Sequence, residues 1–488
     1  MNVKNEKKAL ALSFLGVITL IAVVVGATYA YFTAQGGGTG NINVNANTAT
    51  TDNLSFQTGS AISLTANQED FGQGAGNKSG ETFARATLTA NNATNNATRN
   101  YYVYLDITGN DFEYTTADQQ AELLLKVTGP DGTEVTSISG LTRKTSGGET
   151  GFDITTSTGL ITIADNYEIT STGTVTQEWQ IEVIFANLDS DQNANTGKSF
   201  SATLMIQEEA YEYTLADVCP DGGNLASCIA DLNTLAGDGA GNLYYHDADL
   251  ANGAQDNSYR YSGANPNNYV CFGATGADCQ NEDNQYRIIG VFDGQVKLIK
   301  ATSIGDYAWD GTASDRSNTW DGTTKPDIYT TLNETYYNTI PTEWQNLIAE
   351  TTWKVGGMAS SDTTTAKQYY DVEVGTGQSG YEETMKIGLM YLSDYGYGVN
   401  SEKWTTALYD ENYGTDNWLY LGSNEWLISR VAGSSDVAFF VDSFYDGRMG
   451  NGRVSNTDAV RPSFSLTSTA TISSGTGTSS DPFVLDLG

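Results

Sequence analysis

The sequence contains one histidine, His246, and four cysteines among 488 residues. Zinc sites need several histidines or cysteines at set spacings, and the chain has neither an H-E-x-x-H pair nor a C-x₂-C pair. Zinc peptidases and zinc fingers are therefore excluded. His246 lies beside Asp247 and Asp249, a setting typical of a solvent-exposed loop histidine. No G-x-S-x-G, P-loop or Rossmann fingerprint stands between a predicted strand and a helix.

Basic residues are scarce: 24 lysines and arginines face 59 aspartates and glutamates, which gives a formal net charge of −35. Such a chain repels phosphate backbones and anionic lipid, so nucleic acid is excluded as a partner. Membrane contact is expected only through the N-terminal segment. High acidity favours solubility, and cation binding is the alternative interpretation.

Proline is also rare, with seven residues, whereas the chain has 29 tyrosines, 16 phenylalanines and 8 tryptophans. This supply of large apolar side chains is enough for packed cores and argues against disorder. Frequent threonine, valine and tyrosine favour β structure. A chain of this length is expected to form two or more domains.

The N-terminal segment of the sequence predicts export. Residues 9–27 contain no charge and follow a lysine-rich start. Small residues at Thr28 and Ala30 then predict cleavage between Ala30 and Tyr31, so that residues 1–30 form a signal peptide. Because the uncharged run has 19 residues, a retained membrane anchor is the alternative. Both interpretations place the remaining chain outside the cytoplasm.

Residues 31–207 alternate between apolar and polar side chains. Segments such as "NINVNA", "YYVYLDI" and "EWQIEVIFANL" have a period of two, and clusters of Gly, Asn, Asp and Ser separate them. Seven or eight short strands with polar turns predict an antiparallel β-sandwich.

Several of these segments resemble the TasA/camelysin family of Gram-positive surface proteins. The similar stretches are "GATYAYFTA", which is similar to a SipW-dependent signal, "YYVYLDITGNDF", "LLLKVTGPDG" and "NLDSDQNANTGKSFSATLMIQ". The resemblance covers residues 31–207 and implies a jelly-roll-like fold with a role at the cell surface or in the extracellular matrix of a biofilm. Some family members have been described as metallopeptidases, but the single histidine does not support that activity here.

The rest of the chain has a different pattern. Residues 208–258 are expected to form a linker with one short helix, since Leu225, Ile229 and Leu232 share a helical face. Residues 259–488 are expected to form an α+β domain with a hairpin at Asp293-Gly294 and a helical segment at 327–348. The chain is thus predicted to be mostly β, with a smaller α+β part.

The C-terminal part resembles an uncharacterised domain found on surface proteins of low-GC Gram-positive bacteria. Its segments "WLISR", "FFVDSFYDGRMGNGRV" and "VRPSFSL" are also similar to the end of C-type-lectin-like folds. The calcium-binding signature of true lectins is missing, so the resemblance does not imply sugar binding by that route.

Outside the cytoplasm four cysteines are expected to form two disulfides. Three pairings are possible. The short spacings favour Cys219 with Cys228 and Cys271 with Cys279.

One segment could bind calcium. Alternate positions of "NLDSDQNANTG" carry oxygen side chains: Asp189, Asp191, Asn193 and Asn195. Oxygen ligands at this spacing can surround Ca²⁺, the one cofactor considered. Ala194 and Phe200 stand where a calcium loop would have glycine and glutamate, so a plain polar turn is the alternative.

A repeated Trp-Asp-Gly sequence could bind sugars. It places Trp309 beside Asp310 and Trp320 beside Asp321. Exposed aromatic rings next to carboxylates can stack on sugar rings and bond their hydroxyls. The alternative is a long loop with both tryptophans tucked into the domain.

Taken together, these patterns predict an exported, acidic cell-surface or matrix protein without enzymatic activity. The sandwich would serve structure and assembly, and the C-terminal domain would be displayed for binding or adhesion. Expected partners are other copies of the chain, matrix proteins and surface glycans. A glycan hydrolase with its activity in the C-terminal domain is the alternative.

Overall fold

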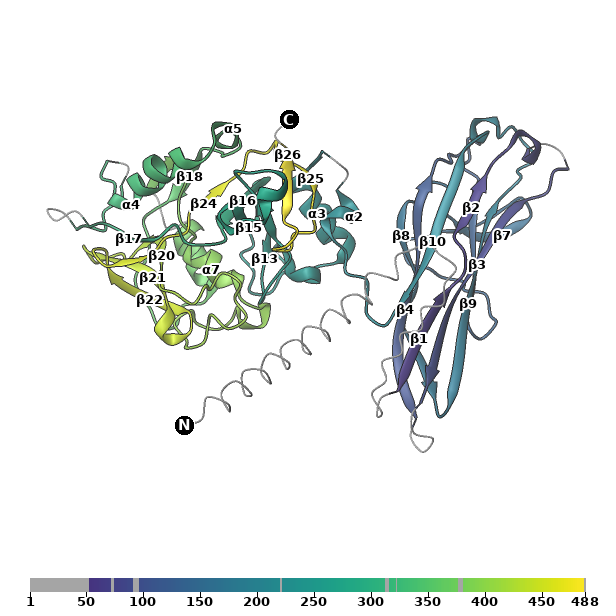
Figure 1. Cartoon of the computed structure of the whole chain (residues 1–488), viewed down its shortest axis with the longest axis horizontal. Helices are drawn as coiled ribbons and strands as arrows, with labels where there is room; N and C mark the ends of the chain where they lie inside the picture. The colour runs from purple at the N-terminus through teal and green to yellow at the C-terminus, as the bar shows by residue number, and fades with distance from the viewer. Residues whose placement is uncertain are drawn as a thin grey trace, which may run out of the picture. The chain divides into compact units, whose positions relative to one another are not determined.

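A computed structural model of the chain describes residues 52–71, 74–90, 96–219, 222–311, 316–321, 323–375 and 381–486. The predicted cleavage position, Ala30/Tyr31, lies outside these residues. The chain divides into two compact units, the first ending at Tyr211 and the second beginning at Glu212 (Figure 1). Both are rich in β structure.

The first unit is an antiparallel β-sandwich, as the alternating sequence predicts (Figure 1). Its larger sheet has the order β1 (Asn53–Thr58), β3 (Lys78–Thr89), β9 (Thr174–Phe185), β5 (Leu123–Thr128), β7 (Glu149–Asp153) and β6 (Arg143–Ser146). Its smaller sheet has the order β2 (Ile62–Thr65), β10 (Ser199–Gln207), β4 (Ala97–Asn110) and β8 (Gly159–Ser171).

Period-two alternation builds the core between these sheets. In β3 every second residue from Thr82 to Leu88 is buried, and the buried face of β4 carries Tyr101 and Val103. Both faces belong to one hydrophobic cluster. The polar end of Tyr101 is satisfied, because its hydroxyl accepts a hydrogen bond from Trp179 Nε1 at 3.0 Å.

The described residues of the second unit form three sheets. The largest has the order β11 (Gly223–Asn224), β25 (Thr471–Ser474), β26 (Phe483–Asp486), β14 (Tyr269–Cys271), β15 (Gln285–Phe292), β13 (Ser258–Tyr261) and β12 (Leu243–His246), and β16 (Gln295–Lys300) joins β15 to β24 (Ser463–Ser465). A second sheet has the order β17 (Asp306–Ala308), β23 (Thr457–Ala459), β20 (Glu425–Arg430), β21 (Val437–Asp442) and β22 (Arg448–Arg453). A hairpin pairs β18 (Thr351–Lys354) with β19 (Glu382–Met385).

Short helices complete this unit: α2 (Leu215–Val218), α3 (Leu225–Ala236), α4 (Asp327–Thr330), α5 (Thr342–Gln345), α6 (Ala366–Tyr370) and α7 (Leu392–Gly398). The predicted helical segment begins at α4 and continues through a π-helical turn, Thr331–Tyr336. Its expected face is buried in the core of the unit: Ile328, Leu332, Tyr336 and Ile340.

The structure places the start of the second unit earlier than the sequence suggested. Segment 212–258, expected as part of a linker, is built into this unit. Leu225, Ile229 and Leu232 of α3 are buried in its core, and β11 pairs with β25. An amphipathic helix needs a partner for its apolar face, and here the sheet of the second unit supplies it.

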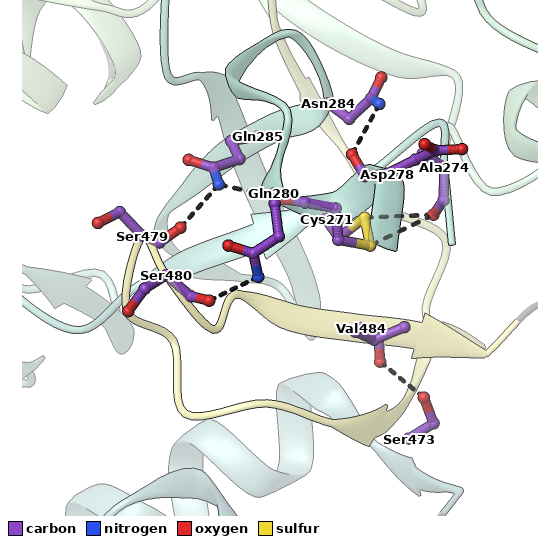
Figure 2. The surroundings of a disulfide bond; sticks show 11 residues. Cys271, Ala274, Asp278, Gln280, Asn284, Gln285, Ser473, Ser479, Ser480 and Val484 are labelled. Carbon is purple, nitrogen blue, oxygen red and sulfur yellow. Dashed lines mark hydrogen bonds between the residues drawn. A yellow bond between two sulfur atoms is a disulfide. The ribbon is translucent and has the colours of Figure 1, made fainter. Parts of the chain in front are cut away.

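Both disulfides of the predicted pairing are present, Cys219–Cys228 and Cys271–Cys279. Figure 2 shows the surroundings of the second. Gln285 Nε2 donates hydrogen bonds to the carbonyl oxygens of Cys279 and Ser479, and Gln280 Nε2 donates to that of Ser480. The disulfide loop is thereby tied to the chain that leads into β26. Two disulfides indicate an oxidising, extracellular environment.

Among the residues that the structure describes, no helix has the length and apolar character needed to cross a membrane.

Candidate ligand-binding pocket

The segment considered for calcium forms a polar turn in the structure. Asn193–Asn195 is a short 3₁₀ helix, and Asp191 Oδ1 accepts a hydrogen bond from the Asn193 N–H. The buried Asn195 side chain accepts from the Glu113 N–H at 3.1 Å and donates to the Glu113 carbonyl at 2.9 Å. Both the oxygen and the nitrogen of the Asn195 amide are hydrogen-bonded within the protein, so the structure favours the polar turn over a calcium loop.

Stacking of a sugar on Trp309 and Trp320 is not supported. Both rings are fully buried and contact each other edge to face, with centroids 5.8 Å apart. Trp309 Nε1 donates to the carbonyl of Leu427. Asp310 and Asp321 accept backbone N–H groups of their own loop. The loop folds inward because two indole rings have a lower free energy when they are buried than when they are exposed to water.

The expectation of an exposed His246 is wrong. His246 is fully buried at the end of β12, where its ring contacts Tyr397 and Trp404. Its Nδ1 accepts the Ala254 N–H at 3.0 Å, which fixes the neutral tautomer with the proton on Nε2. Burial lowers the pKa of His246 well below its usual value, and the nearby Arg260 lowers it further.

This lowered pKa predicts a loss of stability in acid. Between pH 6.5 and the folded-state pKa, the unfolded chain binds a proton that the folded chain does not, so the stability present above pH 6.5 is lost as the pH falls. Relative to His246→Gln, which keeps an acceptor for Ala254, the wild type should lose about 1.4 kcal/mol per pH unit below 6.5. Urea unfolding of both proteins from pH 7 to 5 measures the difference. Parallel curves would contradict a neutral, buried histidine.

A pocket of ≈390 Å³ lies in the second unit, between the large sheet, the β18–β19 hairpin and the start of α7. Strands β13, β15 and β16 supply Arg260, Phe292 and Lys297 to its lining. The predicted hairpin turn at Asp293-Gly294 is present, with positive φ at both residues as a tight Asp-Gly turn requires. This turn places the Asp293 side chain at the rim of the pocket.

The lining of the pocket includes a network of buried charges. Lys297 Nζ lies 2.5 Å from Asp394 Oδ2, and Arg260 Nη1 lies 3.7 Å from Asp394 Oδ1. Arg260 Nη2 also pairs with Asp256 Oδ2 at 2.6 Å. Arg260, Lys297 and Asp394 are all buried. Asp394 has a second task, because its Oδ2 accepts the Tyr391 N–H at the start of α7.

Aromatic rings form the walls around the two cations. Lys297 Nζ lies 4.5 Å from the ring centroid of Tyr391 and 5.0 Å from that of Trp353. The Arg260 guanidinium lies 4.6 Å from the centroid of Phe292. Cation–π attraction at these distances offsets part of the free-energy cost of burying both charges.

Burial sets the protonation of these groups. It lowers the pKa of Lys297, and attraction to Asp394 offsets part of that effect. Burial would raise the pKa of Asp256, but Arg260 and hydrogen bonds from Ser258 outweigh it and hold that pKa below its usual range. The carboxylate of Asp256 is therefore ionised at neutral pH.

A further carboxyl group, Glu373, holds the start of α7 from behind the pocket. Its two oxygens accept the N–H groups of Leu392 and Ser393, and the hydroxyls of Ser393 and Ser429 also contact it. Burial raises the pKa of Glu373 to about 7. Ser393 itself lines the pocket, so Glu373 fixes the position of one wall.

Sequence reasoning missed this pocket. Its charged groups come from distant segments, and Lys297 and Asp394 are 97 positions apart. One signal was available: "QVKLIK" places a lysine within an apolar strand, where a buried charge requires a partner.

No known protein family, curated protein or solved structure matches the chain. The chemistry of the pocket is therefore the main indication of function.

Proposed function

We propose that the chain is an exported cell-surface or matrix protein whose second unit binds a glycan in this pocket. Its first unit serves as the structural and assembly module, in contact with other copies or with matrix proteins. The two disulfides support an extracellular location. The sequence resemblance to Gram-positive surface proteins supports the same place of action.

One observation carries the binding role: aromatic walls stand beside polar side chains that are free to bind. Among the described residues, no hydrogen-bond partner exists for the side chains of Gln295, Thr351 or Thr352, all of which line the pocket. Sugars present apolar ring faces and hydroxyls that both donate and accept. A pocket with aromatic rings and unused polar groups is complementary to that chemistry.

The same geometry favours binding over cleavage. Glycoside hydrolysis needs a protonated carboxyl group as the general acid, with a raised pKa. Asp394 is paired with Lys297, and the pKa of Asp256 is lowered. The carboxylate of Asp256 is thus suited to accept hydrogen bonds from hydroxyls rather than to deliver a proton.

Two substitutions on one hairpin test this role. Thr352 and Thr384 face each other across β18 and β19, and both are exposed, but only Thr352 lines the pocket. We expect Thr352→Arg to fill the pocket and weaken glycan binding at least about tenfold, and Thr384→Arg to leave it unchanged. A glycan array followed by calorimetric titration measures both. Absence of glycan binding would contradict the proposal, and release of reducing ends from a polysaccharide panel would favour the hydrolase alternative.

A further inference from the structure

Lys297 has hydrogen-bonding capacity that the protein does not use. Its ammonium group carries three N–H donors. Among the described residues only one oxygen, Asp394 Oδ2, accepts from it, and its other near neighbours are the rings of Tyr391, Trp353 and Phe292. Aromatic rings attract the charge but provide no oxygen acceptor. Two donors on a buried cation in the pocket lining therefore lack oxygen partners.

Arg260 has unused donors at the same place. Its Nε donates to Ser258 Oγ at 2.9 Å and its Nη2 to Asp256 Oδ2 at 2.6 Å. Its Nη1 lies 3.7 Å from Asp394 Oδ1, beyond hydrogen-bonding distance. Arg260 Nη1 and Lys297 Nζ thus lie beside the two oxygens of the same carboxylate, that of Asp394.

The enclosed charges of the pocket balance, so an anion would be held by the unused donors and not by an excess of positive charge. Two cations, Arg260 and Lys297, share Asp394, and Asp256 pairs with Arg260. Burial lowers the pKa of Lys297 in spite of its attraction to Asp394. An anionic group beside Lys297 would add charge-assisted hydrogen bonds, which are stronger than those to a neutral hydroxyl.

The residues that line the pocket indicate what kind of molecule would bear this anionic group. A pocket of ≈390 Å³ exceeds the volume of a free inorganic anion, and the half-buried rings of Phe292 and Tyr370 in its lining offer a face for an apolar ring surface. Side chains of Gln295, Thr351 and Thr352 are placed to meet hydroxyl groups.

We infer that the pocket selects an acidic sugar, a hexuronate residue, whose carboxylate accepts hydrogen bonds from Lys297 and Arg260 while its ring lies against the aromatic wall. This inference rests on the proposed glycan-binding function and names the class of sugar.

Calorimetric titration of the exported full chain tests the inference with matched probes. The probes are glucuronate, galacturonate, the methyl ester of each, glucose, galactose and acetate. The uronates should bind, and the esters and neutral sugars should bind at least about tenfold more weakly, because they lack the charge-assisted bond. This comparison uses the wild-type protein, so it does not depend on the folding of any variant.

A variant then tests whether Lys297 is the group that binds the carboxylate of the sugar. Lys297→Met keeps the apolar stem and removes the charge, so uronate and glucose should bind it with similar affinity. Lys386→Met is the control, since Lys386 contacts Tyr337 and Gln345 and does not line the pocket. It should retain the preference for uronate.

The outcomes separate the two proposals. Equal binding of glucose and glucuronate to the wild type would overturn the acidic-sugar inference and leave glycan binding intact. If acetate competed as well as glucuronate, the pocket would bind anions in general, and the proposed role of the sugar ring would be overturned. Absence of binding by every sugar would contradict the proposed function itself.

Discussion

Asp394→Asn should lower the free energy of unfolding of the second unit by about 3–5 kcal/mol. Asparagine keeps the shape of the side chain and an oxygen that accepts the Tyr391 N–H. It removes the negative charge that Lys297 and Arg260 share, and both cations are buried. The expected loss therefore measures the cost of leaving Lys297 without its ion-pair partner and Arg260 with Asp256 alone. Guanidinium unfolding followed by tryptophan fluorescence gives the value.

A matched control is available on the surface. Asp371 pairs with Lys367 at 2.5 Å, but its side chain is 53% exposed. Asp371→Asn should change the stability by about 0.5 kcal/mol or less, because water screens exposed pairs. Combining Asp394→Asn with Lys297→Met should recover part of the loss, since one unpaired cation is then removed. A loss below about 1 kcal/mol in Asp394→Asn would show that the network is not essential to stability.

The second large loss of stability is expected for Trp309→Ala. This ring is fully buried against Trp320, and its Nε1 donates to the carbonyl of Leu427 at 3.1 Å. Removing it leaves a cavity and an unsatisfied carbonyl, so the free energy of unfolding should fall by about 3–5 kcal/mol. Thermal unfolding of the variant checks this value.

The tryptophan variant also tests the two interpretations of the repeated Trp-Asp-Gly sequence. If Trp309 is structural, the folded variant should bind glycans as well as the wild type does. Tyr307→Ala nearby is the control, since its ring is 37% exposed and its loss should cost less than about 1 kcal/mol. A variant that loses glycan binding but not stability would restore the stacking hypothesis.

Local patterns were sufficient to predict much of the fold. Alternation in "FARATLTA" places Ala84, Ala86 and Leu88 on one face, and these residues are buried in β3. Both disulfides were predictable because each closes a short loop, with separations of 9 and 8 residues. In these cases the partners are close in sequence, or the period alone determines which face is buried.

The candidate site could not be predicted in the same way. Lys297, Arg260 and Asp394 come together only when two strands and a helix start are packed, and no local period indicates which carboxylate meets which cation. His246 and the two tryptophans show the same limit. Aspartates follow His246 and both tryptophans in the sequence, which suggested exposure. The rings that contact His246, Tyr397 and Trp404, lie far along the chain.

The position of β11 has a consequence for the order in which the second unit folds. This strand is near the start of the unit, yet its partner is β25, and Asn224 bonds to the carbonyl of Ala470, 246 positions later. Only through β25 and β26 does β11 join β14 and the rest of the sheet. Closing so long a loop has a large entropic cost before any contact offsets it. The edge of this sheet that holds β11 is therefore completed only when the last strands of the chain, β25 and β26, are in place.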